Sequence, residues 1–253
     1  MNPSESVDIL GERLGDTYKR HALGVLARGT WFKSLPAELQ TLILDNSYLR
    51  TVNAGQVISP EDQRQTGFFG VLEGQVAITR RVSDTSEFFY HLGGPGFWFG
   101  EAGLINRSVA LVTAAARTEV RYLVLPAARF EGIVERNPAN LRCFVDLQAA
   151  RYSLLLRHLA QRSGLKPEEY LPIRLAEISD LIQSDGTEDK TVTLALSQTD
   201  VANMIGASRQ TVNVLLKKLE AQGLIKLAFR QVKILDPKAL RKGKGDGQIK
   251  QGA

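Results

Sequence analysis

The chain is almost without cysteine, since Cys143 is the only one among 253 residues. One cysteine cannot form an internal disulfide framework, nor can it supply the four thiolates of an iron-sulfur cluster. The three histidines, His21, His91 and His158, are too scattered to indicate a zinc site. We therefore expect no metal site, and a single histidine stays open only as a haem ligand.

Long apolar runs are also missing. No run of about 18 apolar residues occurs, and residues 1–15 are polar and acidic rather than a basic start followed by an apolar core. The sequence supports neither a membrane span nor a secretory signal, so we expect a cytoplasmic protein without membrane contact. No paired carboxylates, nucleophile and base, or metal-ligand spacing stand out, so we expect no enzyme.

The stretch 196–220 reads as two short helices around one glycine. Ser197 is a good N-cap for the first helix, and Gly206 is the residue type most tolerant of a left-handed turn. Ser208 then caps the second helix. This layout indicates a helix-turn-helix, whose second helix presents its first turn to base edges in the major groove of DNA.

The second of these helices has an apolar side and a polar side. We expect its buried stripe to consist of Val212, Leu215, Leu216 and Leu219. Arg209, Gln210 and Asn213 are left on the opposite side, near the start of the helix. A plain two-helix hairpin of an all-α domain would show the same apolar pattern, so charge has to decide between the two interpretations.

Positive charge is concentrated around this motif. From Ser208 to the C-terminus there are 11 Lys or Arg and three Asp or Glu, which gives +8, whereas the whole chain carries +5. Such a distribution is expected of a protein that binds the phosphate backbone. The DNA-binding residues that we predict are Ser197, Thr199, Ser208, Arg209, Gln210, Thr211, Asn213, Lys217 and Arg230.

The hydrophobic period changes to two between about residues 49 and 126. Runs such as 71–82 and 120–125 are rich in Val, Ile, Phe and Tyr, and glycine-containing turns separate them. Short strands at roughly ten-residue spacing predict a small antiparallel barrel or jelly roll. The part of the chain before this β-rich region shows helical patterns.

A longer helix is expected to begin after Asn137-Pro138 and to end at Ser163-Gly164. Its apolar seam, at alternating spacings of four and three, consists of Leu141, Val145, Gln148, Tyr152, Leu155 and Leu159. This spacing is typical of a short coiled coil, and it favours a homodimer interface. The alternative is one amphipathic helix packed on its own barrel. A two-fold dimer would read two half-sites one DNA turn apart.

Three strings follow one another in a characteristic order: GVLEGQV at 70–76, FGEAGL at 99–104, and SRQTV at 208–212 followed by LEAQGLI at 219–225. With this order of parts, the chain from about Leu23 to Leu240 resembles the Crp/Fnr family of bacterial transcription regulators. The resemblance implies an α+β protein with an N-terminal cyclic-nucleotide-binding-type β jelly roll, a long dimerisation helix and a C-terminal winged helix-turn-helix.

We accordingly predict five segments. They are an N-terminal helical segment (1–48), an effector-sensing β-barrel domain (49–135), a dimerisation helix (136–164), a winged helix-turn-helix domain (165–241) and a disordered basic tail (242–253). The wing is a hairpin around residues 229–231.

The effector pocket departs from the family pattern. In cyclic-AMP binders the Gly-Glu string begins a phosphate-binding cassette, its glutamate holds the ribose hydroxyl, and a following arginine pairs with the phosphate. Gly100 and Glu101 match, and Ala102 follows. Arg107 and Ser108 lie several residues closer than in typical binders, and alignment through the downstream strand puts Ser108 at the arginine position. These five are the candidate effector residues.

Three interpretations of the pocket stay open. It binds a cyclic nucleotide, cAMP or cGMP, in an altered cassette, or it binds a different small effector, or it is retained for structure without a ligand. The sequence therefore does not identify the cofactor.

The second helix of the motif also differs from the cyclic-AMP receptors, which carry Arg-Glu-Thr and a further arginine. Here the residues are Arg209, Gln210, Thr211 and Val214. Arg209 suits guanine O6 and N7, Gln210 suits adenine, and Val214 offers apolar contact to a thymine methyl group. Phosphate contacts are expected from Ser208, Thr211, Lys217, Lys226 and Arg230.

We predict a homodimeric, sequence-specific, DNA-binding transcription regulator that binds a two-fold symmetric duplex and in which effector state biases the dimer helices. RNA polymerase is a further candidate partner. The alternative is a cyclic-nucleotide-binding regulatory module that acts on a protein partner, and the basic winged helix argues against it.

Overall fold

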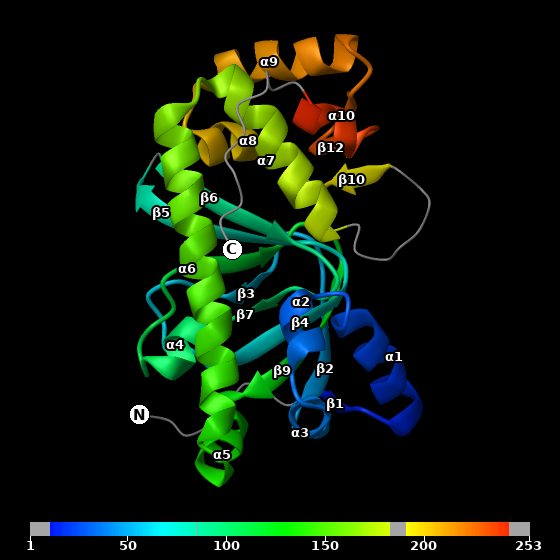
Figure 1. Ribbon diagram of the computed structural model, residues 1–253, viewed down its shortest axis with the longest axis vertical. Coiled ribbons are helices and arrows are strands. Elements are labelled where there is room, and N and C mark those ends of the chain that lie inside the picture. The colour runs from blue at the N-terminus through cyan, green and yellow to red at the C-terminus, as the bar shows by residue number, and fades with distance from the viewer. Residues whose placement is uncertain (1–10, 85, 183–190, 243–253) are drawn as a thin grey trace. The chain divides into compact units, whose positions relative to one another are not determined.

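The computed structural model describes residues 11–84, 86–182 and 191–242 (Figure 1). The chain divides into two compact units, Met1–Leu154 and Leu155–Ala253. Residues 243–253 of the predicted basic tail lie outside the described residues, and Lys242 is the last residue of a short helix. The five segment boundaries given above stay predictions.

The first unit combines helices with two antiparallel sheets. Its helices are α1 (Asp16–Leu26), α2 (Thr30–Ser34), α3 (Ala37–Asp45), α4 (Glu101–Ile105), α5 (Ala127–Arg136) and the first part of α6 (Ala139–Gly164). Its strands are β1 (Glu12–Arg13), β2 (Tyr48–Val52), β3 (Val57–Ser59), β4 (Gly67–Glu73), β5 (Val76–Ser83), β6 (Ser86–Gly93), β7 (Trp98–Phe99), β8 (Thr113–Ala116) and β9 (Val120–Pro126). One sheet has the order β1-β2-β9-β4-β7, and the other has the order β3-β8-β5-β6.

The core of this unit is aromatic. Six consecutive residues of β4 are buried, because side chains cover both faces of this central strand. Phe68 stacks on Trp98 with ring centroids 4.7 Å apart, and Phe144 of α6 meets Phe130 of α5 at 4.8 Å. Phe144 is fully buried, so the first part of α6 is packed against the barrel along one face.

The second unit is a winged helix-turn-helix. Its elements are the end of α6, α7 (Pro167–Ile182), β10 (Val192–Leu194), α8 (Gln198–Ile205), α9 (Arg209–Ala221), β11 (Ile225–Ala228), β12 (Gln231–Ile234) and α10 (Pro237–Lys242). The three strands pair antiparallel in the order β10-β12-β11. The predicted α+β fold class is confirmed. Among the described helices, none is long and apolar enough to cross a membrane.

A buried polar cluster joins α6 to α7 within the second unit. Nη1 of Arg174 lies 2.6 Å from Nε2 of His158 and donates to Oε2 of Glu177 at 2.8 Å. Burial alone would raise the pKa of Glu177, but the contacts with His158 and Arg174 outweigh burial and lower this pKa from its ordinary 4.5 to about 2. The carboxylate therefore stabilises the folded unit at neutral pH.

Replacing Glu177 with glutamine should reduce the free energy of unfolding at pH 7 by about 2 kcal/mol. Because the folded pKa lies below the unfolded one, this contribution is fully present above about pH 4.5 and is lost as the pH falls toward about 2. Urea unfolding at pH 7, 4 and 3 would measure it, with the exposed Glu168→Gln as the control. A difference between wild type and variant that stays constant over this range would contradict the assignment.

Candidate DNA-binding and effector sites

The first helix of the motif, α8, begins with a reciprocal cap. The backbone N–H of Asp200 donates to Oγ of Ser197 at 3.1 Å, and the backbone N–H of Ser197 donates to Oδ2 of Asp200 at 2.8 Å. Two backbone donors that a helix start leaves open are satisfied in this way. The cap fixes where α8 starts, and so where the motif starts.

The turn of the motif is at Gly206, which ends α8 with φ 68° in the left-handed region. This conformation is costly for a residue that carries a Cβ atom. Ser208 then caps α9, because its Oγ accepts the backbone N–H of Thr211 at 3.0 Å. The predicted turn and both predicted caps are present.

The second helix of the motif, α9, buries Val212, Leu216 and Leu219, whereas Leu215 is only half-buried, less than predicted. On its other side Arg209, Gln210 and Thr211 are exposed. Val214, one turn further on, leaves 64% of its area in solvent. The structure therefore brings three predicted base-reading side chains, Arg209, Gln210 and Val214, onto free surface of one helix.

Some predicted DNA-binding residues already have partners within the chain. Oδ1 of Asn213 accepts from Nε2 of Gln198 at 3.2 Å, which ties α9 to the start of α8. The hydroxyls of Ser208 and Thr211 lie 2.8 Å apart. Their positions suit phosphate contact at the start of the helix better than base reading. Thr199, Lys217 and Arg230 are exposed.

The wing, formed by β11 and β12, is hydrogen-bonded to α9, the DNA-reading helix of the motif. The backbone N–H of Leu227 donates to Oε1 of Glu220 at 2.7 Å, and the backbone N–H of Leu224 donates to the carbonyl of Leu219 at 3.1 Å. Val232 and Ile234 are buried beneath the hairpin. The wing thus keeps a fixed position relative to α9.

The candidate effector cassette begins at Gly100, whose φ of 102° leads into α4. The carboxylate of Glu101 is only 3% exposed and forms an ion pair with Arg151 of α6. The same guanidinium donates to the backbone carbonyl of Trp98 and lies 5.1 Å from the ring centroid of Phe97. Oε2 of Glu101 is buried and has no hydrogen-bond partner within the described residues. The group expected to hold a ribose hydroxyl is thus neutralised by the chain itself.

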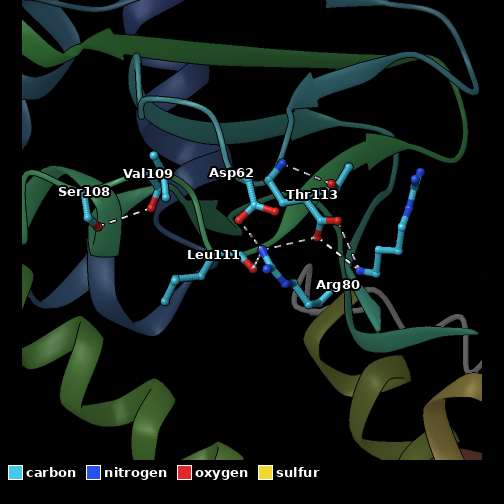
Figure 2. Close-up of polar contacts among 8 residues, drawn as sticks. Asp62, Arg80, Ser108, Val109, Leu111 and Thr113 are labelled. Carbon is cyan, nitrogen blue, oxygen red and sulfur yellow. Dashed lines mark hydrogen bonds and ion pairs between the residues drawn. The ribbon is translucent and has the colours of Figure 1, made fainter. Parts of the chain in front are cut away.

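Figure 2 shows the segment that follows the cassette. The hydroxyl of Ser108 donates to the carbonyl of Val109 at 3.2 Å. Nη1 of Arg80 bonds Oδ1 of Asp62 at 2.9 Å and the carbonyl of Leu111 at 3.1 Å. The arginine that follows the cassette in cyclic-AMP binders has no counterpart among these contacts, because Arg80 comes from β5 and is engaged with Asp62.

Arg107 and Ser108 line a cavity of about 240 Å³ together with Arg64, Gln65, Gly103, Leu104, Ala127 and Glu131. Glu101 is not among these lining residues, and its bond is to Arg151. The candidate effector residues Arg107 and Ser108 thus share this cavity, whereas Glu101 does not line it. In the described part of the chain, no three metal-ligating side chains cluster.

The predicted dimer seam of α6 is partly exposed to solvent. Val145, Tyr152 and Leu159 are 43%, 61% and 49% exposed, whereas Leu141, Gln148 and Leu155 are half-buried. Leu156, which the prediction omits, is 47% exposed beside this row. An apolar row that is exposed along one helix is consistent with the coiled-coil interpretation.

Sequence reasoning missed Arg151, the partner of Glu101. Its position, 50 residues after the glutamate, carries no local signal, because an arginine on a helix surface is ordinarily solvated. Only folding shows that a guanidinium reaches the cassette.

Two family models match the chain. A cyclic nucleotide-binding domain covers residues 49–137, and a Crp-like helix-turn-helix domain covers residues 152–242. A CRP-like cAMP-activated global transcriptional regulator of Mycobacterium tuberculosis is 27% identical over 190 residues, which are 74% of this chain and 83% of that protein. The nitrogen fixation regulation protein FixK of Bradyrhizobium diazoefficiens is 27% identical over 73% of this chain and 77% of its own.

Solved structures have the same fold. FixK2 from Bradyrhizobium japonicum superposes with a TM-score of 0.66 and 18% identity, covering 80% of this chain and 99% of that one. A transcriptional regulator of the CRP/FNR family from Thermus thermophilus superposes with a TM-score of 0.60 and 22% identity, covering 77% of this chain and 96% of that one.

Replacing Arg151 with methionine should destabilise the first unit by about 3 kcal/mol, because it leaves the buried Glu101 carboxylate without a counter-charge. Adding Glu101→Gln should recover more than half of this loss. Denaturant unfolding followed by circular dichroism would measure both, with the exposed Arg157→Met as the control. An equal loss in the control, or no recovery in the double variant, would show that the ion pair does not stabilise the unit.

Proposed function

Since the chain belongs to the Crp/Fnr family of bacterial transcription regulators, we propose that it acts as a homodimer whose two α9 helices read the halves of one two-fold symmetric DNA site. It is a sequence-specific DNA-binding transcription regulator and not an enzyme. The observation that carries the proposal is the exposed first turn of α9. The caps at the starts of α8 and α9 position this turn, and the basic wing follows it.

The half-site follows from the side chains on this surface. Arg209 has the fork geometry to bond guanine O6 and N7, which discriminates against a wrong base by about 1–3 kcal/mol. Gln210 bonds adenine N6 and N7, and Val214 contacts a thymine methyl group. Ser208, Thr211 and Lys217 contact phosphates and set the register of the helix.

The dimer forms along α6. Val145, Tyr152, Leu156 and Leu159 succeed one another at intervals of seven, four and three, and all are exposed in the single chain. A second copy would bury this row in a parallel coiled coil. A single reading helix makes few base contacts, so pairing supplies the specificity that a regulator needs.

The effector of the barrel is proposed to be a small molecule of the cyclic nucleotide type. The domain match and the cAMP-activated relative support this class. A cyclic nucleotide that uses Glu101 for its ribose has to displace Arg151 from the carboxylate, and no arginine at the family position meets its phosphate. We therefore propose an altered cassette in which Arg151 and the ligand compete. RNA polymerase is proposed as the protein partner at the promoter.

In vitro selection of DNA should recover a two-fold site with one guanine in each half that Arg209→Ala no longer distinguishes. The variant should lose roughly tenfold or more in preference at that base, because a bidentate guanine contact is removed. Lys217→Ala is the control, since losing a phosphate contact weakens all sequences alike. A uniform loss for Arg209→Ala would make it a phosphate contact. No shift of any duplex at low salt would favour a module that acts on a protein partner.

Calorimetry with cAMP and cGMP tests the effector. We expect Arg151→Gln to bind a cyclic nucleotide at least about tenfold more tightly than the wild type, because the ligand no longer pays to open the ion pair. Glu101→Gln should weaken binding. Equal affinity in wild type and Arg151→Gln would refute competition, and no binding to either protein at millimolar nucleotide would assign the pocket to another effector class.

A further inference from the structure

The tip of the wing carries an apolar side chain that is exposed to solvent. Phe229 is 90% exposed, the largest exposed fraction among the exposed large hydrophobic residues of the described chain. Tyr152, the comparable aromatic of the α6 row, is 61% exposed. Leaving a phenyl ring in water forfeits the free energy that its burial would give, so a partner that covered this ring would gain that free energy.

The hairpin holds this ring in a defined place. Ala228 and Gln231 are directly paired, so Phe229 and Arg230 alone form the turn between β11 and β12. Arg230 has φ 53°, a left-handed conformation that glycine or asparagine would adopt more easily. A non-glycine residue kept in this conformation at the tip suggests that its side chain has a use.

The charge of the wing points to a polyanion. Lys226 and Lys233 are direct cross-strand partners, both exposed, although like charges in this position repel. Residues 225–234 include no Asp or Glu. An apolar tip flanked by three cations matches DNA, whose phosphates flank a groove floored by stacked bases.

We propose that Phe229 enters the minor groove next to the bases read by α9, wedges into one base step there, and thereby bends the DNA. The inference rests on the proposed function. With α9 in the major groove, the wing that is bonded to it through Leu227 and Glu220 meets the neighbouring minor groove. Arg230 follows along the same groove, where negative potential is high.

The wedge adds specificity outside the contacts of α9. Pyrimidine–purine steps such as TA open most easily, so a TA step in the flank lowers the cost of insertion, and a rigid flank raises it. The flanking preference belongs to Phe229, and the guanine preference belongs to Arg209. The two can therefore be separated.

The test uses full-length protein and a selected two-fold duplex with either TA or rigid A-tract flanks. We expect Phe229→Ala to bind the TA-flanked duplex roughly tenfold more weakly, about 1.4 kcal/mol, and to lose the preference between flanks. The bend of the duplex, measured by energy transfer between dyes on the two DNA ends, should decrease in this variant. The fluorescence of 2-aminopurine placed in the flanking base step should no longer rise when the protein binds. Phe229→Leu should retain most of each effect, because leucine also serves as a wedge.

Val82→Ala, which removes a 67% exposed apolar side chain from β5, is the matched control and should change none of these values. Arg230→Gly should lower the salt slope by about 1 while flank preference persists. Phe229→Ala could keep the affinity, DNA bend and flank preference of the wild type while Arg209→Ala loses the preference for guanine. The proposal that Phe229 is a wedge would then be wrong, and the proposed function would stand. Phe229-dependent binding to anionic phosphatidylserine vesicles, with DNA bending unchanged, would likewise overturn it.

Discussion

A buried charge needs a hydrogen-bonding or oppositely charged partner, and α6 supplies such a partner in both units. In the first unit Arg151 neutralises Glu101, which would otherwise be an isolated carboxylate beneath the cassette. In the second unit His158, seven residues and about two helical turns later, meets Arg174 and Glu177 of α7. The long helix is therefore bonded through polar contacts as well as through its apolar face.

This arrangement gives a physical basis for coupling between the cassette and α6. A ligand changes an equilibrium only through contacts that differ between two states. In the proposed altered cassette, a ligand that bound Glu101 would release Arg151, so the ligand and α6 would compete for one carboxylate. The same helix carries the exposed row that we assign to the proposed dimer, and in that proposal the dimer geometry would set the spacing of the two α9 helices.

The sequence was most informative where structure is local. Ser197, Gly206 and Ser208 act within a few residues of themselves, so their caps and turn could be predicted from type and spacing. The strands between residues 49 and 126 followed from alternation and glycine turns. Contacts made across many residues were not predictable: Arg151 reaches Glu101 from another element, and Arg107 faces a cavity that Glu101 does not line. Whether a tip residue such as Phe229 is covered also depends on what the fold brings near it.

The aromatic core described above places both tryptophans of the chain in one unit. Trp31 and Trp98 pack 5.8 Å apart in the core of the first unit, and residues 155–253 contain no tryptophan. The indole N–H of Trp31 donates to the carbonyl of Cys143 at 2.7 Å, and the carbonyl of Trp98 accepts from Arg151. Intrinsic tryptophan emission is thus a reporter of the barrel and of its contact with α6 alone. Residues 155–253 contribute no tryptophan emission, so a change in this signal, whatever event causes it, reports a change in the surroundings of Trp31 or Trp98 within the first unit.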